Sequence, residues 1–462
     1  MYEKIKQFGR NFTQTTPFIL SNTVILIPYL LFLSLSDGNG WLSILPFTLF
    51  YTFRMTGLFL ISSLRFGLDS YTLLMISLLM GGAGSLLGIL GVIYFPLFYL
   101  SSILLGLSAS WLVPANVTVN AHEKHQGFTN MTANKFPFAI LLLILLFRSI
   151  ALPGTTQIVV TLAIYTLFYI MAYHTVRHYP RYELDFKDIK SNLVATKEFV
   201  LFIGFFILLF LLRNARLLVD PELFDIAVYG FLLLFVLAAF YLGRAKKNWK
   251  LPTWMNLYTF LNGMLGNFLF LFSTIYVGRV YGFDHLAIDM YLPYIAGMIL
   301  AKLIGNRLLR GFSATPLVVQ LAGLVLSLLV LSLLVLLVPY GFVPGLFLLS
   351  FWHAVASSWL NHEYYEIETE IPMDRRIITK LTTQNKGSVT HQFLLMVWML
   401  VIARLMGEPV ALLLRLTGKL SVPSSSVQLM TYAKWGNVGL LLLGVITVYL
   451  LWKRDEKHAP IH

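Results

Sequence analysis

Long apolar segments recur along the whole chain and alternate with shorter polar stretches. Each is close to the roughly 20 residues that a helix needs to cross the hydrocarbon core of a bilayer. Inside lipid, backbone polar groups must bond within their own segment, so each segment is expected to be a helix. We place fourteen such segments at about 17–36, 41–63, 70–93, 95–114, 135–153, 155–176, 197–213, 223–243, 256–281, 287–306, 316–338, 341–360, 388–406 and 434–452. The pattern therefore predicts an all-α polytopic membrane protein.

The composition agrees with this pattern and excludes other classes of protein. Of the 462 residues, 58% are hydrophobic and 12% are charged, whereas about a quarter of the residues of a soluble domain are charged. A soluble enzyme and a disordered chain are therefore excluded. A membrane β-barrel is excluded too, because its strands would alternate polar and apolar residues over about ten positions. The chain has no cysteine, so neither a disulfide nor a thiolate nucleophile is available.

The lysines and arginines orient the segments. With the N-terminus in the cytoplasm, 25 of the 34 basic residues fall on the cytoplasmic side and 7 fall outside, while Arg54 and Arg148 lie within apolar segments. This is the bias that the positive-inside rule describes. It predicts a multi-pass protein of the plasma membrane with both termini in the cytoplasm. The net charge of +13 then reflects topology and attraction to anionic membrane lipids, and we expect no nucleic-acid partner.

Known cofactor and metal motifs are missing. The segment His362-Glu-Tyr-Tyr-Glu366 has the start of a metal-binding helix but lacks the second histidine of the H-E-x-x-H motif. No G-x-x-x-x-G-K sequence followed by Ser or Thr is present to hold the phosphates of ATP. We therefore expect no cofactor, no metal and no drive by ATP within this chain.

A weak internal repeat indicates two related halves. Ser108-Ala-Ser-Trp-Leu112 matches Ala356-Ser-Ser-Trp-Leu360 at an offset of 248 residues, and Thr132-Ala-Asn-Lys135 resembles Thr383-Gln-Asn-Lys386 at an offset of 251. Both pairs fall at the cytoplasmic end of one segment and the start of the next. Chance recurrence of small residues and tryptophan is the alternative. The repeat predicts two homologous bundles of six helices each.

The repeat also divides the chain into three parts. Residues 1–176 form the N-terminal six-helix bundle, and residues 256–462 form the C-terminal bundle with a cytoplasmic tail. Residues 177–255 then provide cytoplasmic linkers and an inserted transmembrane hairpin. Its first helix, Phe199–Leu212, is almost purely apolar, and a helix that is apolar all round has no polar cavity to face. We therefore expect the hairpin to be peripheral.

Six helices, two inserted helices and six more resemble the fourteen-helix form of the major facilitator superfamily. The resemblance implies six-helix halves related by a pseudo-two-fold axis along the membrane normal. That family's loop between helices two and three typically reads G-x-x-x-D-R-x-G-R-R, of which Phe66-Gly-Leu-Asp69 keeps only the glycine and the aspartate. Ser101 and Ser102 stand where proton-coupled members often carry an arginine. The resemblance implies secondary transport by alternating access, not enzymatic activity.

Two arginines lie within the apolar segments. A charged side chain there is unfavourable by about 2.5–3.5 kcal/mol on insertion scales, so it is a functional candidate by default. Arg54 lies at about mid-depth, and by resemblance its helix lines the central cavity. It is a candidate for binding an anionic substrate, with a structural ion pair or a carbonyl clamp as the alternative. Arg148 lies about five residues, roughly 7 Å, below the outer end of its segment, where snorkelling towards the surface is the alternative.

Three further polar residues complete the candidate substrate site. His353 has an imidazole that titrates near neutral pH, so it is a candidate proton carrier, and a hydrogen-bonded structural histidine is the alternative. Asn22 and Asn262 are candidate polar groups of a cavity, with hydrogen bonding between helices as the alternative. No aspartate or glutamate falls near mid-membrane. A cavity with arginine and histidine but no deep carboxylate suits an anionic or zwitterionic substrate.

Three functions follow from these residues. The first is a monomeric secondary transporter of a small, partly apolar solute or lipid, with a proton as the candidate coupling ion. The second is a membrane-embedded enzyme acting on a lipid-linked substrate, in which His353, or His362 with Glu363, supplies the acid–base groups. The third is an uncoupled lipid scramblase or a scaffold. The transporter is the function we expect.

Overall fold

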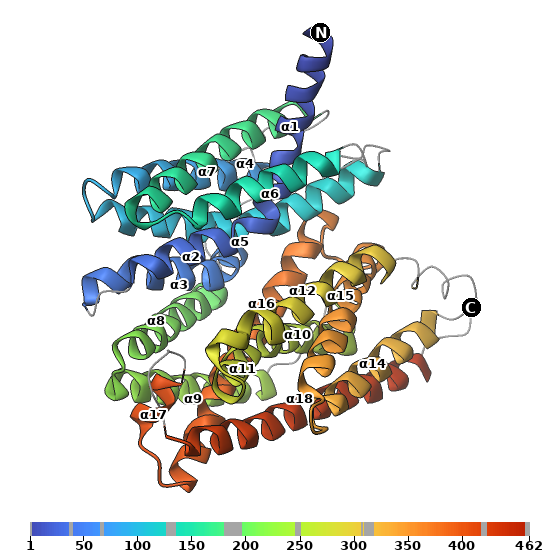
Figure 1. Ribbon diagram of the computed structural model, residues 1–462. Helices are drawn as coiled ribbons and strands as arrows, with labels where there is room; N and C mark the ends of the chain where they lie inside the picture. The colour runs from blue at the N-terminus through green and yellow to red at the C-terminus, as the bar shows by residue number, and fades with distance from the viewer. Residues whose placement is uncertain are drawn as a thin grey trace. The chain divides into compact units, whose positions relative to one another are not determined.

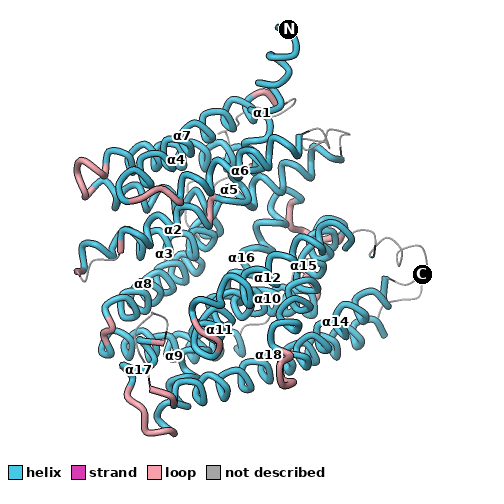
Figure 2. The backbone as a smooth tube through the Cα atoms, in the orientation of Figure 1, coloured by secondary structure: helices cyan, strands magenta, loops and turns pink. Residues whose placement is uncertain are grey.

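The computed structural model describes residues 2–36, 40–64, 69–125, 135–179, 196–244, 251–305, 308, 318–416 and 423–457. Over these ranges the chain is helical and contains no strand, as Figure 2 shows. Eleven helices are long and apolar enough to cross a membrane, and a bent pair, Gly9–Thr23 with Leu26–Leu35, brings the number to twelve. The expected all-α polytopic architecture is confirmed.

Each of the fourteen predicted segments coincides with a helix. Two of these helices are short, since Phe136–Ile150 has 15 residues and Val318–Val335 has 18. A helix rises about 1.5 Å per residue, so neither crosses a hydrocarbon core of about 30 Å without its flanking residues. The total of fourteen spans therefore stays a prediction.

The chain forms two compact units, and the first is Met1–Leu218. Its bent first helix turns by 58° between α1 and α2. Asp69 caps α4, since its carboxylate accepts a hydrogen bond from the Thr72 amide at 2.7 Å. The helices of this unit, labelled in Figure 1, are α1 (Tyr2–Thr23), α2 (Leu26–Leu35), α3 (Trp41–Ser63), α4 (Ser70–Leu90), α5 (Leu97–His125), α6 (Phe136–Ile150), α7 (Gly154–Arg177) and α8 (Thr196–Leu218).

The second unit is Val219–His462. Here α10, η2 and α11 follow one another without a break, and so do η4, α12 and η5. The elements of this unit are α9 (Pro221–Arg244), α10 (Thr253–Asn267), η2 (Phe268–Phe272), α11 (Ser273–Val280), η3 (Phe283–His285), η4 (Leu286–Tyr291), α12 (Leu292–Leu300), η5 (Ala301–Gly305), α14 (Val318–Val335), α15 (Phe342–Glu366), α16 (Met373–Leu405), α17 (Val410–Arg415) and α18 (Ser425–Lys457).

The same packing pattern occurs inside both units. In the first, α5 packs on α3 and α4, while α7 packs on α4 and α1. In the second, α15 packs on α12 and α14, while α18 packs on α14 and α10. The repeated tryptophans, Trp111 and Trp359, lie in the corresponding helices α5 and α15. Two six-helix sets with matching neighbours agree with the internal repeat that the sequence predicts.

The two helices of the expected hairpin, α8 and α9, fall in different compact units. Within its unit α8 packs along α3, and within its own unit α9 contacts α16 and α17. The three-part division at 1–176, 177–255 and 256–462 stays a prediction. The loop residues 66–68, residues 132–134 of the repeat and the linkers at 180–195 and 245–250 lie outside the described residues.

Candidate functional site

Two of the residues singled out in the sequence meet in the second unit. His353, on α15, has its Nε2 2.9 Å from the backbone carbonyl oxygen of Asn262, on α10. A carbonyl oxygen only accepts, so Nε2 must carry the proton and donate it. The Asn262 side chain is fully buried, and neither its Oδ1 nor its Nδ2 has a hydrogen-bond partner. A buried amide left with a free donor and a free acceptor is costly, and it could accommodate a ligand or water.

A second histidine, absent from the sequence-based candidates, lies nearby on α16. His391 is fully buried, and its Nδ1 is 3.1 Å from the amide nitrogen of Asn267 on α10. The Nε2 of His391 has no partner. An amide NH₂ group donates, so Nδ1 accepts and the unpartnered Nε2 carries the proton of the neutral ring. The signal in the sequence was a histidine inside the apolar segment 388–406.

Glycines allow this second pair to meet. A side chain at Gly263 of α10 would lie 1.8 Å from the Gln384 carbonyl oxygen, and one at Gly387 of α16 would lie 1.8 Å from the Phe260 carbonyl oxygen. The two helices therefore touch backbone to backbone, as small residues permit in membrane bundles. Asn267 and His391 lie four residues after the two glycines, and residues four apart share a helix face.

A lysine lies buried on the same helix. Lys380 is 1% exposed, and its Nζ donates to the Ser357 carbonyl oxygen at 3.0 Å, the Ser357 hydroxyl at 3.2 Å and the Asn361 Oδ1 at 2.8 Å. These neutral oxygens match the three donors of an ammonium group, but none supplies a negative charge. Sequence reasoning had counted Lys380 among the cytoplasmic basic residues. It is buried because α16 begins at Met373, well before the apolar segment.

Together these residues form a polar cluster in the second unit, which we define as Asn262, Asn267, His353, Lys380 and His391. It lies where α10, α15 and α16 pack on one another. Lys380 and His391 are separated by about 16 Å along α16, at 1.5 Å per residue. The acids of these three helices fall only near their ends, at Glu363, Glu366 and Asp374. The cluster thus combines one buried cation, two titratable rings and free amide groups.

The remaining candidates lie in the first unit. Arg54 is partly buried in α3, with Nη1 3.4 Å from the Met55 sulfur. Asn22 is exposed beside the bend between α1 and α2, and its amide donates to the Phe18 carbonyl of its own helix at 2.7 Å. Arg148 is exposed on α6 in a surface hollow of about 420 Å³, which is lined otherwise by Ile140, Leu143, Ile144, Phe147 and Ala151. This apolar, exposed setting is the one that snorkelling requires.

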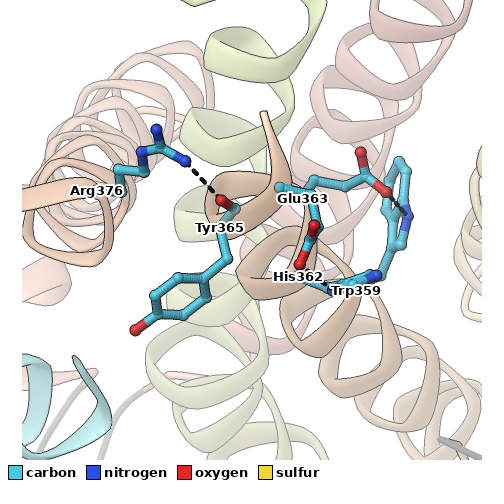
Figure 3. A network of polar contacts seen from close by, with 6 residues as sticks. Trp359, His362, Glu363, Tyr365 and Arg376 are labelled. Atoms are coloured by element: carbon cyan, nitrogen blue, oxygen red, sulfur yellow. Dashed lines mark hydrogen bonds and ion pairs between the residues drawn. The ribbon is translucent and has the colours of Figure 1, made fainter. Parts of the chain in front are cut away.

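Two of the residues named for the enzymatic alternative, His362 and Glu363, are shown in Figure 3, at the end of α15. Glu363 accepts a hydrogen bond from the Trp359 indole at 2.9 Å. The Nδ1 of His362 lies 3.9 Å from the Oε1 of Glu366, and 70% and 61% of the two side chains are exposed. Arg376 donates to the Tyr365 carbonyl. His362 and Glu363 therefore pair with different residues, and among the described residues no His, Asp or Glu group is arranged to hold a metal.

Among the comparisons with known proteins, only the one with solved structures identifies the fold. No protein-family model matches the sequence, and neither does any curated protein. Among solved structures, the chain is similar to the in meso crystal structure of the POT family transporter PepTSo, with a TM-score of 0.51 and 12% sequence identity over 98% of each chain. At this identity the similarity shows the fold alone. The chain is a multi-pass helical membrane protein that shares its fold with a transporter of known structure.

Proposed function

We propose that this chain is a secondary transporter of the fourteen-helix major facilitator type. It moves a small anionic or zwitterionic, partly apolar solute or lipid by alternating access between two six-helix bundles. The observation that carries the proposal is the buried polar cluster, which lies between packed helices of a transporter fold. Free polar groups inside a membrane bundle are unfavourable unless they serve a substrate or an ion pathway.

The charges in the bundle support an anionic or zwitterionic substrate. Lys380 is held only by neutral oxygens, so its positive charge is not neutralised by a carboxylate in this structure. Arg54 adds a second cation in the middle of α3. A substrate carboxylate or phosphate would supply Lys380 with the negative charge that its three bonded oxygens do not provide. An organic cation would instead require a buried acid, and α10, α15 and α16 have acids only near their ends.

The histidines of the cluster support proton coupling. A neutral imidazole has one protonated and one unprotonated nitrogen, so each of these rings can take up a proton and release it as its surroundings change. The Nε2 of His391 is buried and has no partner, so protonation of Nδ1 there would break its bond with Asn267. His353 and His391 would thus replace the carboxylates that the bundle lacks.

The proposal also includes the membrane location, the oligomeric state and two secondary contacts of the substrate. The distribution of lysine and arginine supports a plasma-membrane protein with cytoplasmic termini. The chain acts as a monomer among membrane lipids. Asn22, beside the bend of the first span, and Arg148, on the outer part of α6, are proposed as secondary contacts of the substrate.

The test starts from a ligand-stabilisation screen on the purified protein, with amino acids, short peptides, organic acids and phospholipids. The best ligand is then used in proteoliposomes with an imposed proton gradient. We expect the solute to accumulate against its gradient in wild type, and at least tenfold less in Lys380→Met. Lys302→Met is the matched control, because Lys302 is an exposed lysine of the same unit. This variant should transport normally. Gradient-independent lipid movement, or a chemically altered substrate, would contradict the transporter proposal.

A further inference from the structure

The last two turns of α8 contain two buried arginines. Arg213 is 8% exposed and Arg216 is 9% exposed. The predicted segment 197–213 ends at Arg213, but α8 continues to Leu218 and carries both arginines within the helix. Residues three apart lie on the same helix face, so the two guanidinium groups are neighbours. They are also like charges, and each raises the cost of burying the other.

Aromatic rings partly offset the free-energy cost of burying the charge of Arg213. The guanidinium carbon of Arg213 lies 4.2 Å from the ring centre of Tyr51 and 4.7 Å from that of Phe47, both on α3. Its Nη2 donates to the Tyr29 hydroxyl, on α2, at 3.0 Å. Ring faces attract a desolvated cation, by about 2 kcal/mol in favourable cases. Arg213 is therefore held in a defined position by three side chains from two helices.

The second arginine, Arg216 in the last turn of α8, keeps unpaired donors in the described part of the chain. The Nε and Nη1 atoms of Arg216 are buried without a hydrogen-bond partner, and so is the Nε of Arg213. In the described part of the chain, neither arginine forms an ion pair with a carboxylate. The Oδ1 of the neighbouring Asn214 is not available to either arginine as a free acceptor, because it already accepts from the Thr48 hydroxyl at 3.1 Å. Three buried donors on two adjacent cations thus have no acceptor.

From this geometry we infer a binding site for a phosphate group between Arg213 and Arg216. An arginine stays charged at every relevant pH, so burial cannot be relieved by loss of a proton. A phosphate carries negative charge on several oxygens, which can accept from both guanidinium groups at once. The phosphate belongs either to a lipid headgroup or to a soluble phosphate ester. This site lies outside the polar cluster of the second unit, and it stands or falls independently of the transport proposal.

The test uses the full chain, freed of bound lipid, in dodecyl maltoside, a detergent that contains no phosphate, with the melting temperature and the Kd as readouts. Glycerol 3-phosphate is the soluble probe, with glycerol as its uncharged control, and added phosphatidylglycerol is the lipid probe. We expect one of the two phosphate probes to raise the melting temperature of wild type, and Arg216→Gln to weaken its Kd at least tenfold. Arg177→Gln is the matched control, because Arg177 is an exposed arginine of the same unit, and it should bind like wild type.

The two probes distinguish the source of the phosphate. Stabilisation by glycerol 3-phosphate identifies a soluble ester, and stabilisation by phosphatidylglycerol alone identifies a lipid headgroup. Without any phosphate probe, Arg216→Gln should melt at the same or a higher temperature than wild type, because an unpaired buried charge is removed. An unchanged Kd in Arg216→Gln would overturn the inference. A lower melting temperature without probe that Arg216→Lys restores would do so too, because it would assign Arg216 a structural role.

Discussion

Replacing Gly387 by alanine should separate α10 from α16. The added Cβ would lie 1.8 Å from the Phe260 carbonyl oxygen, whereas ordinary contact begins at 3.4 Å. The obstructing atom belongs to the backbone of α10, so no side-chain rotation can relieve the contact. The two helices would have to move apart by about 1.6 Å, which is the difference between those distances. The hydrogen bond of 3.1 Å between Asn267 and His391, one turn further on, would then be lost.

The size of the effect follows from two opposing contributions. Overpacking a tight interior site destabilises a protein by about 1–3 kcal/mol. Alanine is a better helix former than glycine by about 1 kcal/mol, which acts in the opposite direction. Because a backbone atom must move, we take the upper part of the first range and expect a net loss of about 2 kcal/mol. At about 2–4 °C per kcal/mol, the melting temperature should fall by roughly 4–8 °C.

The assay is thermal unfolding of the purified protein, followed by the fluorescence of its tryptophans. Gly439→Ala is the matched control, because Gly439 lies within α18 and nothing comes within 4 Å of its added Cβ. That variant should melt at the same temperature as wild type or slightly higher. If Gly387→Ala melts no lower than Gly439→Ala, the backbone contact between α10 and α16 is wrong, and so is the account of how Asn267 reaches His391.

Variants at three further positions test the transport proposal, with transport measured in proteoliposomes once a substrate is identified. Arg54→Ala should abolish transport with little change in melting temperature, whereas Arg54→Lys, which keeps the charge but loses the planar fork, should only weaken apparent affinity; normal transport by Arg54→Ala would refute this. His353→Gln should alter the dependence of transport rate on pH between 5 and 8 more than it alters affinity, and an unchanged pH profile would exclude His353 as the proton carrier. Lys380→Met should also lower the melting temperature, because Asn361 loses its donor at a cost of about 1–3 kcal/mol; an unchanged melting temperature would contradict the bonds that hold the lysine.

The sequence alone determined where the helices lie. Inside lipid, the polar groups of the backbone must be paired within their own segment. An apolar segment of sufficient length therefore forms a helix. The same argument singled out Arg54 and His353, because a polar side chain inside such a run is conspicuous by itself. The repeat of Trp111 and Trp359 predicted two related six-helix sets, and the matching packing around α5 and α15 agrees with it.

Only the tertiary structure decided which polar groups are buried and which of them meet. Hydropathy shows that a segment lies in lipid, but it does not show which helix packs beside it. The pairing of His391 with Asn267 could therefore not be derived from the sequence. Lys380 and Arg216 fall outside the apolar segments. Hydropathy does not predict how far a helix continues into the polar residues beside such a segment. They are buried because α16 and α8 continue past those segments into contact with neighbouring helices, and burial of this kind is a property of packing.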